Sequence, residues 1–374
     1  MNFRTHLIPV SALLPMSSIC HANPVLTKLY DKGYLLFVGQ DNQTIDEYHE
    51  SGFFPTAGGV VTYTSLYTLR GLREYVDYGS GPVHASVLVE KYPDSALMIG
   101  LALMDEEGIS NGLNRIANGE FDDQIISLAE FVRDLERPVF VRIGYEFDGP
   151  WYGYSPEPYK AAYRRIVNLS REIAPNFINV WHSVAYVSDP SILANLGKTY
   201  TEYMMDWYPG DEYVDWTGVT WFTHLYETTA QEFVDLSRKL NKPVMMAETA
   251  PMSYDLEDAT YGSPVDNGSV KAGDIIDTDL SADEIWNRWF QPMINFMEKN
   301  DCYIHAICYI NTHWDSQPMW KRDTETGNYQ GLYWGDSRLQ ANPGIAKKWQ
   351  DLISSSKWIN RDELDFKDWM IERN

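Results

Sequence analysis

Residues 139–146 read VFVRIGYE, a nearly continuous apolar run that leads directly into Glu146. Residues 244–248 read VMMAE and repeat this arrangement, with Glu248 at the end. Short runs of this kind are typical of strands that are buried on both faces of a parallel sheet. A glutamate at the end of such a strand must be paired, partly solvated or functional, because an isolated charge is costly to bury. These two stretches therefore indicate both a fold and a site.

Similar apolar runs recur along the chain and alternate with helical patterns. Helical periodicity is found at residues 125–132, 159–173 and 233–240, and Ser281 opens a further helix in which Pro292 marks a kink or break. Alternating strands and helices imply parallel pairing, and no Gly-rich nucleotide-binding motif is present to favour an open sheet. We therefore predict a single-domain α/β protein, a closed (β/α)8 TIM barrel. Its expected strands are residues 34–38, 60–63, 97–103, 139–143, 178–181, 219–222, 244–247 and 304–310.

The two glutamates are 102 residues apart, which corresponds to three strand–helix units. This spacing places them at the ends of the fourth and seventh strands, where barrel enzymes carry their catalytic residues. Glycoside hydrolysis needs such a pair, one carboxylic acid to protonate the leaving oxygen and one carboxylate to attack or stabilise the anomeric centre. The alternative is a structural ion pair, for example between Glu146 and Arg142 on the same strand face. The matched positions of the two glutamates favour catalysis.

Several segments together resemble glycoside hydrolase family 26, namely Arg142–Trp151, Trp207–Trp216, the strand ending at Glu248, and Trp334–Arg338. The likeness covers about residues 35–350. It implies a retaining barrel in which Glu146 is the acid/base, Glu248 is the nucleophile and Trp151 flanks the cleavage site. The family includes β-mannanases, mixed-linkage glucanases and β-1,3-xylanases.

Three positions depart from the pattern of that family. Tyr145 stands where its mannanases usually carry histidine, and Asp148 replaces a frequent asparagine. Phe222 occupies the strand-6 position that often supplies a tyrosine to the nucleophile. These departures leave the carboxylate pair intact. The form of residues 145–149 is closer to the β-1,3-xylanases of the family than to its mannanases.

Polar and aromatic residues near the strand ends are candidates for contacts with a sugar. Asp148 either turns the loop or binds sugar hydroxyls, and His182 is either a core histidine or a substrate contact. Trp151 and Tyr152 lie in a polar, Gly-rich loop, which favours stacking on sugar rings over anchoring of the loop. The predicted substrate-binding residues are Arg142, Tyr145, Asp148, Trp151, Tyr152, His182, Trp221 and Trp314.

Charge and composition restrict the partners. The chain has 53 Asp and Glu against 30 Lys and Arg, for a formal net charge of −23. Such a surface repels phosphate backbones, which argues against nucleic acid and favours a neutral polysaccharide over a sulfated one. No metal-binding spacing such as H-E-x-x-H or C-x-x-C occurs, so we predict no metal and no cofactor. No apolar run beyond the N-terminus is long enough to span a membrane, and we expect a monomer.

The N-terminus resembles a secretory signal. Residues 1–22 combine Arg4, an apolar run and a small residue, Ala22, at the expected cleavage site. The alternative is a disordered or packed N-terminal arm. We predict a secreted or periplasmic protein, with residues 1–22 as signal peptide and residues 23–374 as the catalytic domain. We also expect Cys302 and Cys308 to be free, buried thiols, because six residues of strand separate them by about 20 Å.

The predicted function is that of a secreted, retaining endo-β-glycanase. Its substrate would be a β-linked plant or algal polysaccharide of the β-1,3-xylan or β-mannan type. One alternative is a related barrel hydrolase that acts on another marine polysaccharide. The other is a non-catalytic glycan-binding barrel, in which Trp151 and Trp221 hold a sugar and no bond is cut. The paired strand-end glutamates favour the enzyme.

Overall fold

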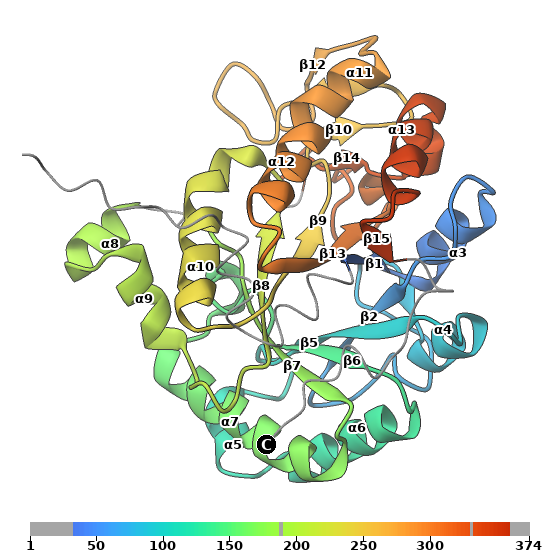
Figure 1. The fold of residues 1–374 in the computed structure, drawn as a ribbon. Coiled ribbons are helices and arrows are strands. Elements are labelled where there is room, and N and C mark those ends of the chain that lie inside the picture. The colour runs from blue at the N-terminus through green and yellow to red at the C-terminus, as the bar shows by residue number, and fades with distance from the viewer. Residues whose placement is uncertain (1–32, 187–189, 330–331, 360–374) are drawn as a thin grey trace, which may run out of the picture.

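Eight parallel strands close into a barrel within residues 33–186, 190–329 and 332–359, the part of the chain that the computed structural model describes (Figure 1). Each expected strand is confirmed, most with slightly longer bounds. The observed strands are β1 (Tyr34–Gly39), β2 (Gly59–Ser65), β5 (Ala96–Ala102), β6 (Val139–Ile143), β7 (Phe177–Ser183), β8 (Trp216–Trp221), β9 (Val244–Thr249) and β13 (Ile304–Ile310).

The barrel closes between its first and last strands. β1 pairs in parallel with β13, with Leu35 opposite Ala306 and Gly39 opposite Ile310. Every other neighbouring pair around the barrel is also parallel. Parallel pairing needs a crossover after each strand, and this is why helices alternate with the strands.

Helices surround the strands on the outside of the barrel (Figure 1). Their apolar faces pack against the outward side chains of the strands and form the larger of two core clusters. The α-helices are α3 (Asn42–Glu50), α4 (Ala85–Lys91), α5 (Gly112–Ala117), α6 (Asp122–Asp134), α7 (Pro156–Ile173), α8 (Pro190–Leu196), α9 (Tyr200–Trp207), α10 (Glu227–Lys239), α11 (Ala282–Ile285), α12 (Gln291–Lys299) and α13 (Pro343–Ile353). Short 3-10 turns lie at η1 (Pro150–Tyr152), η2 (His224–Tyr226), η4 (Trp314–Ser316) and η5 (Leu339–Ala341).

The helix predicted to begin at Ser281 has the expected start and an irregular middle. The Ser281 side chain accepts from the backbone of Glu284, and both bonds of the capping box are present. The turn η3 (Trp286–Phe290) is a π-helix, and α12 follows it with Pro292 in its first turn. Proline cannot donate the backbone bond of a regular helix interior, so the wider turn ahead of Pro292 accommodates it without ending the helix.

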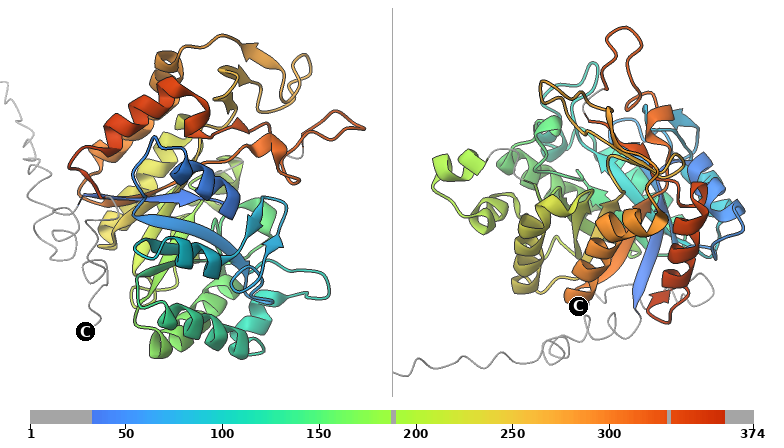
Figure 2. Two further views of the ribbon diagram at one scale, coloured as in Figure 1. Left: turned by 90° about the vertical axis from the view of Figure 1, so that its right-hand side faces the viewer. Right: turned by 90° about the horizontal axis from the view of Figure 1, so that it is seen from above.

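The long loop after the seventh strand contains a small sheet of its own. Strands β10 (Tyr254–Asp255), β11 (Thr260–Gly262) and β12 (Ile275–Asp277) pair antiparallel in sequence order, and β14 (Gly335–Asp336) joins β10 in parallel. This insertion stands above the barrel strands in both figures of the fold (Figures 1 and 2). The remaining short strands are β3 (Val76–Asp77), β4 (Pro82–Val83) and β15 (Trp358–Ile359).

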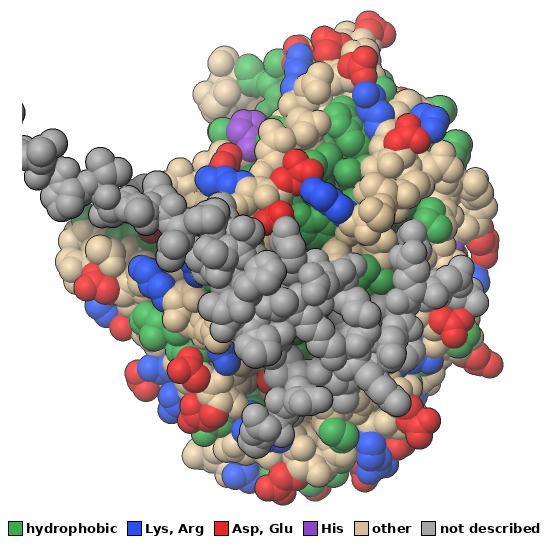
Figure 3. All heavy atoms as spheres, viewed as in Figure 1, with side chains coloured by type: hydrophobic (Ala, Val, Ile, Leu, Met, Phe, Trp, Pro, Cys, Tyr) green, Lys and Arg blue, Asp and Glu red, His purple; other side chains and the backbone are tan. Residues whose placement is uncertain are grey.

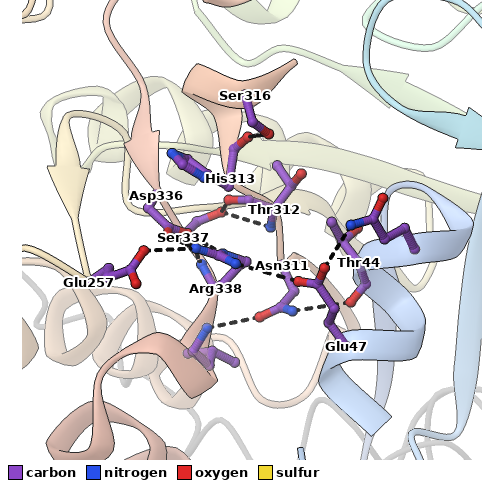
Figure 4. Close-up of polar contacts among 12 residues, drawn as sticks. Thr44, Glu47, Glu257, Asn311, Thr312, His313, Ser316, Asp336, Ser337 and Arg338 are labelled. Atoms are coloured by element: carbon purple, nitrogen blue, oxygen red, sulfur yellow. Dashed lines mark hydrogen bonds and ion pairs between the residues drawn. The ribbon is translucent and has the colours of Figure 1, made fainter. Parts of the chain in front are cut away.

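Arg338 ties this insertion to the barrel, as Figure 4 shows. Its guanidinium contacts the fully buried Asp336 of β14 at 2.7 Å, Glu257 of the insertion at 3.0 Å and Glu47 of α3 at 3.6 Å. A planar guanidinium with five donors can serve several carboxylates at once. The Trp334–Arg338 segment, which the family likeness singled out, therefore joins three elements at one edge of the barrel.

The cysteine prediction is half wrong. Cys308 is a free and buried thiol, as expected, but Cys302 is disulfide-bonded. Because Cys308 is free, the two do not pair with each other. The proposed signal peptide, residues 1–22, also lies outside the described residues. Among the helices that are described, none is both long and apolar enough to cross a bilayer.

Candidate active site

The two glutamates lie where the sequence placed them. Glu146 follows the fourth barrel strand, β6, and Glu248 lies near the end of the seventh, β9. Only 6% of Glu146 and 7% of Glu248 is exposed. Both residues therefore sit at the carboxyl ends of parallel strands, in surroundings with little water, where electrostatic effects between groups are large.

The backbone of Glu146 adopts a conformation that side chains rarely take. Its φ is +50°, and Gly144, two residues before it, has a φ of +54°. The turn is held by a bond from the backbone N–H of Gly149 to the Glu146 carbonyl at 2.8 Å, and by Phe147, which stacks on Trp181 at 4.8 Å. A left-handed glutamate persists only where its surroundings enforce it, and such strain gathers at functional sites.

Burial raises the pKa of Glu146 to about 8, and the negative charge of Glu248 adds to the shift. Asp148 raises this pKa further, while the Thr220 hydroxyl, which donates to Oε1 at 2.7 Å, and Arg142 lower it. The raised pKa keeps Glu146 protonated in neutral solution. A carboxyl group in that state can act as a general acid.

Glu248 has two donors on a single oxygen. The Arg142 guanidinium Nη1 and the Tyr63 hydroxyl both donate to Oε1, the latter at 3.0 Å. Arg142 is fully buried and lies over the rings of Tyr63 and Tyr145, 5.1 and 5.2 Å from their centroids. The ion pair considered for Arg142 thus exists, but with Glu248 and not with Glu146. Because no part of Arg142 is exposed, its prediction as a direct contact of substrate is wrong.

Tyr63 donates a hydrogen bond to Glu248 and was not among the predicted site residues. The pattern of the family often has a tyrosine at the sixth-strand position where Phe222 stands, yet the donor to Glu248 comes from β2 on the other side of the barrel. Gly100 in the neighbouring strand β5 leaves room for it, since an added Cβ would lie 2.4 Å from the Tyr63 ring. A glycine inside an apolar strand was the available signal, because it marks close approach of another group.

His182 is a core histidine, fully buried in β7. Its Nε2 lies 3.0 Å from the Thr220 hydroxyl and its Nδ1 lies 3.4 Å from Nη1 of Arg142. Burial, with the charge of Arg142 beside it, holds the pKa of His182 well below its ordinary value, so the ring is neutral. Of the two interpretations given for His182, the structure supports the core histidine.

Aromatic side chains lead from the two glutamates to the surface. The rings of Tyr145 and Tyr152 meet edge to face at 5.4 Å, and Trp151 meets Tyr152 at 6.0 Å. Trp151 is 52% exposed, and Tyr145 and Tyr152 are half-buried. The three predicted residues are thus brought together beside Glu146, with one indole open to solvent.

Two of the predicted tryptophans do not reach this surface. Trp221 is 2% exposed and packs on Phe296 of α12, 4.7 Å between ring centroids. Successive strand residues point to opposite faces, so the inward position belongs to Thr220 and Trp221 must face the helices. Trp314 is also 2% exposed, because it stacks on Trp334 at 4.7 Å. The prediction that these two line the substrate site is wrong.

Asp148 anchors a loop. One carboxylate oxygen accepts from the Ser183 hydroxyl at 2.7 Å and the other from the Val184 backbone N–H at 2.8 Å. Burial raises the pKa of Asp148 to about 6. Both oxygens are used within the protein, so the structure supports the loop-turning role over a bond to sugar. Nowhere in the described ranges do three His, Cys, Asp or Glu residues gather in a way that could hold a metal ion.

Comparison with known proteins gives concordant results. The model of Glycosyl hydrolase family 26 matches residues 104–261, which include both glutamates. Beta-1,3-xylanase TXYA of a Vibrio species is 34% identical over 339 residues, covering 89% of this chain and 68% of that protein. A beta-1,3-xylanase of an Alcaligenes species is 32% identical over 334 residues, covering 88% and 65%. The chain spans about two thirds of the length of these relatives.

Solved structures share the barrel. A modular endo-beta-1,4-mannanase from Cellulomonas fimi aligns with a TM-score of 0.54 and 12% identity, over 91% of this chain and 76% of that one. The xylanase XynB from Paenibacillus barcinonensis aligns with a TM-score of 0.51 and 11% identity, over 88% and 98%. At these identities the likeness concerns the fold.

Proposed function

Because this chain belongs to glycosyl hydrolase family 26, it is a glycosidase, and we propose that it is an endo-β-glycanase that cleaves β-1,3-xylan with retention of configuration. The observation that carries the proposal is the unequal surroundings of the two glutamates. Glu146 is kept protonated, whereas Glu248 faces the permanent positive charge of Arg142. Two carboxyl groups in such different surroundings suit the roles of acid and nucleophile.

The proposed reaction proceeds in two displacements. Oε2 of Glu248 is free of the donors on Oε1 and attacks the anomeric carbon, while Glu146 gives its proton to the departing glycosidic oxygen. The glycosidic bond breaks as the bond to Glu248 forms. Glu146, now a carboxylate, then takes a proton from water, whose oxygen attacks the same carbon and releases the sugar from Glu248.

The choice of β-1,3-xylan rests on the two relatives of that name and on the residues around the acid/base. Tyr145, which stands where mannanases of this family usually carry histidine, packs between the rings of Tyr63 and Tyr152. We propose that the exposed Trp151 stacks on a sugar ring of the bound chain, since aromatic faces suit the apolar faces of neutral sugars.

The direct test is reducing-end release by the purified protein from β-1,3-xylan, β-1,4-mannan, mixed-linkage glucan and a sulfated galactan. We expect release from β-1,3-xylan, lost in Glu248→Ala and Glu146→Ala with folding intact by circular dichroism. Oligosaccharides of several lengths at early times would indicate endo action, and proton NMR of the first anomer released would report retention. Release from mannan alone would overturn the substrate, and full activity of either variant would overturn the role of that residue.

Export of the protein is part of the same proposal, because a polymer of this kind is degraded outside the cell. We propose that residues 1–22 direct secretion or export to the periplasm. Mass spectrometry of the N-terminus of protein recovered from the medium or periplasm tests this. An intact Met1 on material found only in the cytoplasm would contradict it.

A further inference from the structure

Thr220 lies between the two catalytic strands. It is on β8, is 8% exposed and stands opposite Glu248 in the register with β9. Its hydroxyl does not bond to Glu248, however, and instead donates to Oε1 of Glu146 at 2.7 Å. One oxygen of the acid/base is therefore held by a short bond from inside the barrel.

The direction of this bond is fixed by its neighbours. Arginine carries only donors, so Nδ1 of His182, 3.4 Å from Nη1 of Arg142, must accept. The neutral ring then carries its proton on Nε2, which donates to the Thr220 oxygen at 3.0 Å. The hydroxyl of Thr220 has a single hydrogen, and it is left to point at Glu146. The chain runs from Arg142 through His182 and Thr220 to the acid/base.

We infer that Thr220, oriented by His182, is a positioning residue that keeps the transferable proton of Glu146 on Oε2. The inference rests on the proposed function and adds to it. The carbonyl oxygen of a protonated carboxyl is a stronger acceptor than its hydroxyl oxygen, so the bond from Thr220 to Oε1 favours the acidic hydrogen on Oε2. That Oε2 hydrogen is the one passed to the glycosidic oxygen, and Oε2 later receives the proton of the attacking water.

Groups other than Thr220 also affect the pKa of Glu146. The charged or titratable ones are Glu248, Asp148 and Arg142, together with the phenols of Tyr145 and Tyr152. Among these, Glu248 and Asp148 raise the pKa of Glu146, and Arg142 lowers it. Thr220 stabilises the carboxylate, so its removal should raise the pKa of the acid/base further while the other groups stay in place.

The decisive measurement needs no substrate. Infrared difference spectra between the native protein and Glu146→Gln isolate the carbonyl stretch of protonated Glu146. In Thr220→Val, whose side chain has the same shape without the hydroxyl, we expect this band to move to higher wavenumber as its hydrogen bond is lost, and its titration to move to higher pH. Thr220→Ser should leave both unchanged. An unaltered band in Thr220→Val would show that the proton is not placed by this residue.

Thr217→Val is a matched control. Thr217 is a buried threonine on the same strand, and its hydroxyl donates to Ser237, away from the site. This variant shares any general cost of losing a buried hydroxyl from β8. We expect it to leave the infrared band and the pH profile of turnover at their native values. If the infrared band of Thr217→Val shifted as much as that of Thr220→Val, Thr220 would have only a structural role.

Kinetics separate failure of this inference from failure of the proposed function. On β-1,3-xylooligosaccharides, Thr220→Val should lose about 10- to 100-fold in kcat/KM, with the alkaline limb at higher pH. On a dinitrophenyl glycoside, whose leaving group departs without a proton, the loss in glycosyl transfer should be much smaller. Equal losses on both substrates would contradict proton placement. Native protein that cleaves neither would contradict the proposed function, while the infrared band still decides on Thr220.

Discussion

Glu146 is the residue whose ionisation should govern the pH range of activity. Its pKa lies near 8 in the folded protein, so the fraction that carries the catalytic proton falls as the pH rises through this value. We expect kcat/KM to decline with an apparent pKa of about 8 on the alkaline side. The measurement is a rate profile at substrate concentrations well below KM. A limb near the ordinary glutamate value would mean that Glu146 is not the acid.

Tyr63 should support Glu248, the proposed nucleophile, from the far side of the barrel. Tyr63→Phe removes one of the two donors on Oε1 of Glu248 and keeps the ring that packs beside Arg142. We expect kcat to fall by about tenfold or more, since a bond to a charged group contributes about 1.5–3 kcal/mol. Tyr67→Phe is the control, because its buried hydroxyl donates to the Leu103 carbonyl. Equal losses in the two variants would refute a specific role for Tyr63.

At the scale of the element, strand β5 shapes the site because Gly100 has no side chain and leaves room for the Tyr63 ring. Gly100→Ala would place a Cβ 2.4 Å from the Tyr63 ring and 3.1 Å from Nη2 of Arg142. We expect a loss of about 1–3 kcal/mol in unfolding free energy, with reduced turnover because the tyrosine must move. Chemical denaturation measures the first effect.

A double variant checks the cause of that loss. Tyr63→Ala in the Gly100→Ala background opens the space that the new methyl needs. We therefore expect the double variant to lose less unfolding free energy than the sum of the two single losses, without regaining activity. Strict additivity of the two stability changes would show that the ring and the methyl do not meet.

The elements were more predictable than the side chains they carry. The apolar runs around Val141 and Met246 located their strands because burial on both faces leaves a continuous pattern. The alternation of side chains along a strand decides which way Trp221 faces. An error of one residue in placing the strand reverses that direction, and the sequence pattern did not place the strand to a single residue. Tyr63 and Glu248 are 185 residues apart, and no local pattern encodes a contact over that separation.

For the whole molecule, the net charge of −23 should act on the choice of polymer. Figure 3 shows acidic and basic side chains interspersed on the parts of the viewed face that the grey residues leave visible. We expect turnover of neutral xylan to be independent of salt between about 0.01 M and 0.15 M, while inhibition by a sulfated galactan strengthens as screening grows. Initial rates with sulfated and desulfated galactan measure this. Stronger inhibition at low salt would reveal a local basic patch.

The pairing of β1 with β13 has a consequence for the order of events during synthesis. About 270 residues separate the two strands, and a ribosome that adds about 5–20 residues per second needs tens of seconds to deliver the second after the first. Until then the edge of β1 has no partner strand on that side. The nascent chain must carry an unsatisfied edge through most of translation, and β9, the strand that carries Glu248, gains its last neighbour at the same moment as the barrel closes.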